Sequence, residues 1–235
     1  MTHLDSARAP ATTGRCLLAR PLHQRAVLVL VAGLAAGGVA GLADAARERD
    51  GVSWLDPATA AAVLRLRTPG LTDLAQAFTF AGSEVVVGGL AVLVLVALVV
   101  RRRFAPAATF ALGIGGSAFL TVAVKLVVAR QRPGAADRLG ALDTSYSFPS
   151  GHTLNSAVFL ALVVWLLWPA ARYAAQVALV AGGAVMAVGV GASRVYLGYH
   201  WLTDVLASAL VAIGWLSVVW LLRAPLARIV VRPAP

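Results

Sequence analysis

The sequence predicts an all-α, polytopic membrane protein with six transmembrane helices. Of its 235 residues, 60% are hydrophobic and only 13% are charged, and the mean hydropathy is +0.82. A soluble domain normally carries about twice that share of charged residues. Apolar runs recur along the chain, and several approach the ~20 helical residues that cross a bilayer core. Most of the basic residues lie between these runs, at what would be the membrane surfaces.

We assign the six transmembrane helices to six apolar runs, of which the fourth and fifth are close to the minimum length for a crossing. The runs are 26–43, 74–100, 104–127, 152–168, 174–191 and 202–222. Glycine and alanine recur in the first, third and fifth, which suits close contacts between helices in lipid. A further segment, 57–67, is a candidate for a short helix on the outer membrane surface.

The chain is expected to form one membrane domain, 26–222, between a basic tail at 1–25 and a second basic tail at 223–235. The first run could instead be a cleaved signal, because "ADA" at 43–45 resembles a cleavage site. Its 18 apolar residues exceed the usual signal core of about 7–15, which favours an uncleaved anchor. Cys16 is the only cysteine, so the sequence contains no disulfide framework.

The net charge of +10 is explained by membrane topology rather than by binding to nucleic acid. Cytoplasmic loops of membrane proteins carry an excess of arginine and lysine. The basic groups that six crossings place together on one side are Arg8, Arg15, Arg20, Arg25, Arg101, Arg102, Arg103, Arg172, Arg223, Arg228 and Arg232. We expect that side to be cytoplasmic, and residues 44–73, 128–151 and 192–201 to lie on the outer side.

The outer side nevertheless holds a basic cluster in "KLVVARQRP", at the end of the third run. It contains Lys125, Arg130 and Arg132, and Lys125 is the only lysine among 20 basic residues. One lysine at this depth is usually a snorkelling anchor. Three cations within eight residues, on the side where positive charge is disfavoured, indicate an anionic ligand.

Two further polar clusters begin helices on the same side. "PSGH" at 149–152 places Ser150, Gly151 and His152 at a helix start, where unpaired N–H groups and the helix dipole favour anions. A simple capped turn would explain this motif alone. "SRVYLGYHWLTD" at 193–204 contains His200 and Asp204, which share a helix face at a spacing of four. A carboxylate on one imidazole nitrogen leaves the other nitrogen free for attack or proton transfer.

Together these clusters resemble the three-part signature of the type 2 phosphatidic acid phosphatase superfamily, which also includes vanadium-dependent haloperoxidases and acid phosphatases. The signature is carried by Lys125 with Arg132–Pro133, by "PSGH" at 149–152, and by Ser193–Arg194 with His200 and Asp204. Two positions differ from the common pattern: Gln131 and Leu202 stand where proline is frequent. Neither difference removes a reacting group.

The resemblance implies a membrane lipid phosphatase whose site lies at the outer ends of helices 3, 4 and 6. His200 would attack phosphorus to form a phosphohistidine, Asp204 would orient it, and His152 would act as acid and then base. The phosphate would be held by Lys125, Arg132, Arg194, Ser150 and Gly151. These groups imply no cofactor and no divalent metal, because the cations can neutralise the charge of a phosphoryl group.

Several alternatives stay open at this level. A transporter would place its polar groups near the bilayer midplane, whereas these crowd one surface. A non-catalytic lipid-binding protein would not need the reacting groups, and the haloperoxidases are soluble and much longer. The substrate candidates are phosphatidic acid, phosphatidylglycerol phosphate and polyprenyl mono- or diphosphate, with polyprenyl diphosphate favoured by family analogy.

The remaining charged residues of the outer side are assigned more ordinary roles. Arg130 and Arg138 are expected to be solvated loop charges, although they could assist with a second phosphate or a headgroup, and Asp137 and Asp143 are expected to be ordinary loop residues. Glu84, inside the second run, either pairs with a cation of the site or faces a polar gap between helices.

Overall fold

Helices account for most of the residues that the computed structural model describes, 22–48 and 50–230, and no strand occurs among them. The α-helices are α1 (Leu22–Glu48), α2 (Leu55–Arg65), α3 (Pro69–Ala81), α4 (Glu84–Val100), α5 (Phe104–Val128), α6 (Gly151–Leu167), α7 (Tyr173–Tyr196) and α8 (Leu202–Val230). By length and composition α1, α5, α7 and α8 can each cross a membrane, as can α6 with the 3₁₀ turn that continues it to Ala170, and α3 with α4 can form a sixth, bent crossing. The expected all-α, polytopic fold is confirmed.

The second crossing differs from the single straight helix expected over 74–100. Helix α3 ends at Ala81, α4 begins at Glu84, and the two are bent by 40°. Ser83 starts the new helix, because its Oγ accepts a hydrogen bond from the Val86 N–H at 3.3 Å. Glu84 therefore stands in the first turn of α4, where the helix dipole favours a carboxylate, and not in a helix interior.

Other boundaries shift by smaller amounts. Helix α8 continues to Val230, beyond the expected end at 222, with Pro225 inside it. A short helix is present in the expected segment as α2, which starts at Leu55 rather than at 57. Most of the expected amino-terminal tail, residues 1–21, and residues 231–235 of the carboxyl-terminal tail lie outside the described residues.

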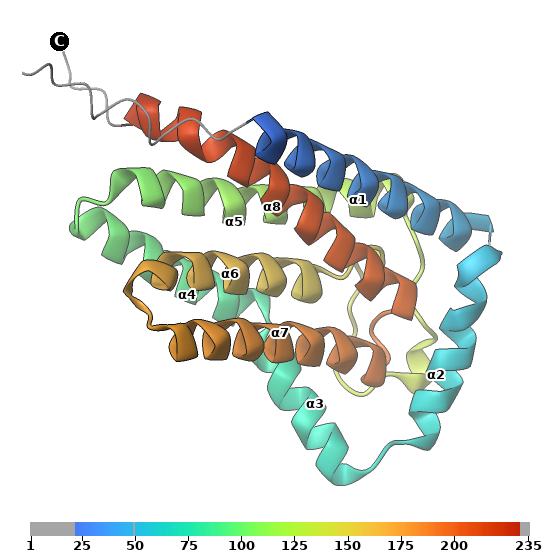
Figure 1. Cartoon of the computed structure of the whole chain (residues 1–235). Coiled ribbons are helices and arrows are strands. Elements are labelled where there is room, and N and C mark those ends of the chain that lie inside the picture. Colours follow the sequence, from blue (N-terminus) through green and yellow to red (C-terminus); the bar gives the residue numbers. More distant parts are fainter. Residues whose placement is uncertain (1–21, 49, 231–235) are drawn as a thin grey trace, which may run out of the picture.

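Helix α8 lies beside α1 and also packs on α5 and α6, while α6 packs on α7 (Figure 1). The apolar core is formed mainly by α4, α5 and α6, where Phe110 and Phe159 meet edge to face with ring centroids 6.2 Å apart. Helices α5 and α8 approach closely at Trp215. A β-carbon added to Gly116 would lie 2.0 Å from the Trp215 ring, whose Nε1 donates to the Gly113 carbonyl at 2.8 Å.

The order of the helices brings four helix ends to one end of the bundle. The carboxyl ends of α5 and α7 and the amino ends of α6 and α8 meet there, beside α2 and the loop 129–150 (Figure 1). The connections α4–α5 and α6–α7 lie at the opposite end, so Arg101, Arg102 and Arg172 are far from this loop. The three polar clusters of the sequence therefore share one end of the molecule.

Candidate active site

Asp204 occupies the first turn of α8 and is fully buried. Its Oδ2 accepts a hydrogen bond from the Trp201 N–H at 2.9 Å, receives the hydroxyl of Ser147, and lies 3.4 Å from His200 Nδ1. Its Oδ1 accepts from Arg130 Nη1 at 2.6 Å. Each carboxylate oxygen thus has a partner, as a buried charge requires, and the side chain is held in one orientation.

His200 lies in the turn between α7 and α8, 3% exposed, with its other ring nitrogen facing a cation. Nε2 is 3.2 Å from Arg132 Nη1, which can only donate, so Nε2 carries a lone pair and Nδ1 carries the proton toward Asp204. Burial lowers the pKa of His200 to about 4, despite the opposing effect of Asp204. The imidazole is therefore neutral at neutral pH, with Nε2 as its basic atom.

Arg132 is held rigidly by the loop 129–150 and by the turn before α8. Nε donates to the Ser145 carbonyl at 2.8 Å, Nη1 to the Tyr199 carbonyl at 2.7 Å, and Nη2 forms an ion pair with Asp143 at 2.6 Å. Burial opposes ionisation of Asp143, but hydrogen bonds from Ser145 and the charge of Arg132 outweigh it and lower its pKa. Asp143 is therefore an ion-pair partner of Arg132 and not the ordinary loop residue expected from the sequence.

Lys125 and Arg194 approach the same region from α5 and α7. Lys125 Nζ donates to the Tyr146 carbonyl and to Ser145 Oγ. Arg194 is 4% exposed, donates to Thr79 Oγ1 at 2.8 Å, and lies 3.9 Å above the centre of the Tyr199 ring. Among the described residues, Arg194 Nε is buried and has no hydrogen-bond partner. A buried guanidinium with an unpaired donor is costly on its own and well suited to an incoming anion.

The start of α6 supplies Ser150, Gly151 and His152. Ser150 is the N-cap residue and is fully buried, with Thr153 Oγ1 donating to its Oγ at 3.0 Å. A β-carbon on Gly151 would lie 3.1 Å from Thr121 Cγ2 and 3.4 Å from Glu84 Oε1, so a larger residue here would press against the Thr121 methyl group. The same distances place the Glu84 carboxylate beside the first turn of α6. His152 follows in this turn and is half-buried.

From the sequence, neither Asp56 nor Ser147 was assigned to the site, and the pairing of Arg130 was not predicted. Arg130 was expected to be a solvated loop charge, but it is 11% exposed and paired with two buried carboxylates. Arg138 is not a fully solvated charge either, because its guanidinium lies 5.6 Å from the centre of the Tyr199 ring, and its Nε is buried without a hydrogen-bond partner in the described part of the chain. One feature of the sequence could have pointed to Asp56: it lies beside Pro57, at the start of a short apolar helix on the same side of the membrane as the basic cluster.

The arrangement combines a fixed imidazole with cations that converge on it, and a second histidine at a helix amino terminus. Within the described ranges, 22–48 and 50–230, no group of three or more His, Cys, Asp or Glu residues is arranged to hold a metal ion. The chemistry that these side chains themselves can supply is nucleophilic attack, proton transfer and the binding of an anion with delocalised charge.

Comparisons with known proteins identify the family of the chain. The family model of the PAP2 superfamily matches residues 106–228, slightly more than half of the chain. Phosphatidylglycerophosphatase B of Bacillus subtilis is 31% identical over 166 residues, covering 69% of this chain and 80% of that protein. The Escherichia coli protein of the same name is 39% identical over 80 residues, covering 34% of this chain and 30% of its own length.

Two solved structures resemble this chain. One is described as the first transmembrane PAP2 type phosphatidylglycerolphosphate phosphatase from Bacillus subtilis. It superimposes with a TM-score of 0.69 at 26% identity, covering 85% of this chain and 95% of its own. LpxE of Aquifex aeolicus, with a TM-score of 0.54 and 24% identity, covers 70% of this chain and 94% of its own, and shows the likeness of the fold. The chain therefore belongs to the PAP2 superfamily and is a membrane lipid phosphatase.

Proposed function

We propose that the protein hydrolyses a lipid phosphate through a phosphohistidine on His200, at the outer face of the membrane. The observation that carries the proposal is the orientation of His200. Asp204 holds its Nδ1 side, and Nε2 points to a region bordered by Arg132. A neutral imidazole fixed in this way has one nucleophilic atom and one direction of attack.

In the first step His200 Nε2 attacks phosphorus, and the bond between phosphorus and the lipid oxygen breaks. A protonated His152 gives its proton to the departing oxygen, which leaves as a neutral lipid alcohol, or as a lipid monophosphate if the substrate is a diphosphate. The developing imidazolium is stabilised by Asp204, which is itself held by Arg130, Ser147 and the Trp201 N–H.

In the second step His152, now neutral, takes a proton from water, and the water oxygen attacks phosphorus. The N–P bond breaks, inorganic phosphate leaves, and His200 returns to its neutral form. One residue thus serves as acid and then as base.

The phosphoryl oxygens are held by Lys125, Arg132, Arg194 and the amino terminus of α6 around Ser150 and Gly151. The unpaired Nε of the buried Arg194 supports this assignment, because an anion would satisfy it. Arg132 already contacts His200 Nε2, so a phosphate that binds Arg132 lies close to the nucleophile. Phosphoryl transfer relies mainly on such positioning and on cations that match the charge of the transferred group.

For the substrate we propose phosphatidylglycerol phosphate first, because the relatives that cover most of this chain carry that activity in their names. Phosphatidic acid and polyprenyl diphosphate remain predicted substrates, since the cations of the site recognise phosphate and not a particular tail. The outer orientation follows from the basic groups at the opposite end of the bundle.

The test is phosphate release by the purified protein from a panel of these lipids in detergent micelles, before and after exhaustive chelation of metals. We expect turnover of phosphatidylglycerol phosphate that survives chelation and is abolished in His200→Ala. An acid-labile, alkali-stable phosphoenzyme should appear during turnover. Activity that persists in His200→Ala, or that requires added metal, would refute the proposed mechanism.

A further inference from the structure

We infer that Asp56 and Arg130 act as a positioning pair that fixes Asp204 from the side opposite His200. The inference rests on the proposed roles of His200 and Asp204. Neither Asp56 nor Arg130 is assigned to contact the phosphate. Their effect on catalysis passes through the orientation and charge of Asp204.

Arg130 lies directly against Asp204. Nη1 donates to Asp204 Oδ1 at 2.6 Å and to Thr203 Oγ1 at 2.7 Å, and Nη2 donates to Asp56 Oδ2 at 2.6 Å. Its guanidinium also lies 5.5 Å from the centre of the Trp201 ring. Arg130 binds Oδ1 of Asp204, whereas His200 lies at Oδ2, so one carboxylate joins the two residues.

Asp56 attaches α2 to the start of α8. It is 2% exposed, and its Oδ1 accepts a hydrogen bond from the Thr203 N–H at 2.9 Å. Its Oδ2 accepts from Thr203 Oγ1 at 2.6 Å and from Arg130. The Thr203 N–H is one of the first amides of α8, which have no partner within the helix. Asp56 therefore caps α8 from another helix and fixes the turn that carries Asp204.

The charges explain why both members are needed. Asp56 and Asp204 are two buried carboxylates, and Arg130 is the guanidinium that bridges them. Without Arg130 the carboxylates would repel each other, and Asp204 Oδ1 would lose its charged partner. Asp204 could then turn away from His200 Nδ1, where the present separation of 3.4 Å already leaves little margin for a hydrogen bond.

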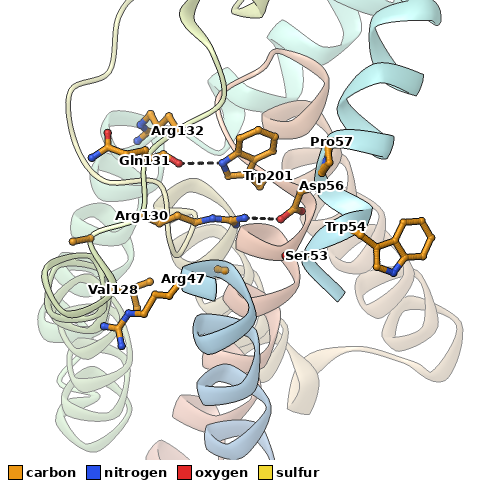
Figure 2. A pocket seen from close by; sticks show the side chains of 12 residues that line it. Arg47, Ser53, Trp54, Asp56, Pro57, Val128, Arg130, Gln131, Arg132 and Trp201 are labelled. Atoms are coloured by element: carbon orange, nitrogen blue, oxygen red, sulfur yellow. Dashed lines mark hydrogen bonds and ion pairs between the residues drawn. The ribbon is translucent and has the colours of Figure 1, made fainter. Parts of the chain in front are cut away.

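The pair is reachable from outside the protein. Asp56 and Arg130 line a pocket of about 630 Å³ together with Arg47, Trp54 and Trp201 (Figure 2). Figure 2 shows the guanidinium of Arg130 extended toward Asp56, below the contact between Gln131 and Trp201. A small cation that enters this pocket could occupy the place of a deleted Arg130 side chain.

The first experiment is chemical rescue of Arg130→Ala in the full-length protein, assayed on the lipid phosphate that it turns over fastest. We expect kcat to fall by about 10²-fold, the scale of a small misplacement of a catalytic group. KM should stay nearly unchanged, because a residue that does not touch substrate leaves binding intact. Guanidinium chloride at non-denaturing concentrations should restore part of kcat, and sodium chloride at equal ionic strength should not.

Arg47→Ala is the matched control. Arg47 lines the same pocket and is exposed, but its hydrogen bond goes to the Val127 carbonyl and not to Asp204. The kcat of Arg47→Ala should match that of the unmodified protein and should not change when guanidinium is added. A kcat of Arg130→Ala equal to that of Arg47→Ala, or a loss that guanidinium fails to restore, would overturn the inference.

Asp56→Asn tests the second member, with the exposed Asp44→Asn as its control. The amide keeps the size of the side chain, but it cannot accept hydrogen bonds at both of its terminal atoms. We expect Asp56→Asn to have a lower kcat that guanidinium does not restore. In the double variant Asp56→Asn/Arg130→Ala, the fold-decrease in kcat should be smaller than the product of the two single fold-decreases. Independent, multiplying losses would show that the two residues do not act as a pair.

Two further variants keep the test decisive. If Arg130→Ala does not fold, Arg130→Lys replaces it, because one ammonium cannot bridge Asp204, Thr203 and Asp56 in the way a guanidinium does. Wild-type kcat in Arg130→Lys would overturn the inference. His200→Ala is assayed in parallel: residual activity there refutes the proposed function, whereas an inactive His200→Ala with an unaffected Arg130 variant refutes only the positioning role.

Discussion

His200 is acted on by two opposing influences, and the balance sets its charge. Burial disfavours the imidazolium, whereas the Asp204 carboxylate favours it, and burial prevails to give a pKa of about 4. We expect His200 to stay neutral as the pH falls through the usual histidine range of about 6.5, and to gain its proton only near pH 4. Spectra of ¹⁵N-histidine-labelled protein in micelles, assigned with His200→Gln, would measure this. A titration of His200 near pH 6.5 would contradict it.

The two histidines should also differ in what their loss does to catalysis. His200→Ala removes the nucleophile, so turnover of every phosphate ester should be abolished. His152→Ala removes the proton donor, so esters with an acidic leaving group, such as a nitrophenol, should recover part of their rate. The measurement is kcat for a lipid phosphate and a nitrophenyl analogue in both variants. If His152→Ala lowers kcat equally for the lipid phosphate and the nitrophenyl analogue, His152 is not the proton donor.

Single residues were predictable from the sequence where they belong to a short, ordered motif. His200 and Asp204 are four residues apart, and from this spacing the sequence predicts that they meet, although His200 lies in the turn before α8 and not on the helix itself. Asp56 and Arg130 could not be found in this way, because 74 residues separate them and their pairing depends on how α2 packs against α8. The sequence interpretation treated Arg130 as a loop charge for that reason. Long-range ion pairs become visible only when the tertiary structure is known.

At the level of elements, apolar length predicted the crossings but not the break between α3 and α4. Gly82, Ser83 and Glu84 interrupt the apolar run over three residues only, and the sequence interpretation did not treat so short an interruption as a break between helices. The reason for the glycine is a contact with α7: a β-carbon on Gly82 would lie 2.5 Å from Val190. Such a contact requires the position of another helix and cannot be read from local composition.

The crossing of α5 and α8 permits a matched test of helix contact. Gly116→Ala would place a methyl group against the Trp215 ring, whereas Gly115→Ala meets no atom within 4 Å. Overpacking costs about 1–3 kcal/mol, and replacing a helical glycine by alanine gains roughly 0.5–1 kcal/mol. We expect Gly116→Ala to lower the apparent melting temperature in detergent and Gly115→Ala to leave it unchanged or raise it. Equal shifts would show that Trp215 moves aside without cost.

For the whole molecule, the arginine-rich connections and tails at the end opposite the candidate site predict its orientation. Single cysteines placed at 134–145 or at 169–173 in a Cys16→Ser background would be labelled in intact cells with a membrane-impermeant maleimide. We expect labelling of 134–145 in intact cells, and labelling of 169–173 only after the membrane is permeabilised, because arginine-rich connections stay cytoplasmic. The reverse pattern would place the site in the cytoplasm and end the proposal of an outer-leaflet substrate.

The same geometry bears on the substrate's tail. Lys125, His152 and Asp204 lie at the ends of helices α5, α6 and α8, each of which is long and apolar enough to span the bilayer. A lipid anchored by its tail could present its phosphate to these groups without leaving the membrane. Its phosphate is already confined near the site, whereas a soluble ester must give up more freedom of motion on binding.

We therefore expect kcat/KM to be much higher for long-chain lipid phosphates than for short, water-soluble phosphate esters. Differences among long-chain lipids should be smaller, because the cations and N–H groups of the site contact phosphate. The comparison uses mixed micelles at a fixed mole fraction of lipid, so that surface concentration does not vary with chain length, and His200→Ala supplies the background rate. If a short ester is hydrolysed as efficiently as the long-chain lipids, the tail contributes nothing to catalysis, and recognition must rest on the phosphate alone.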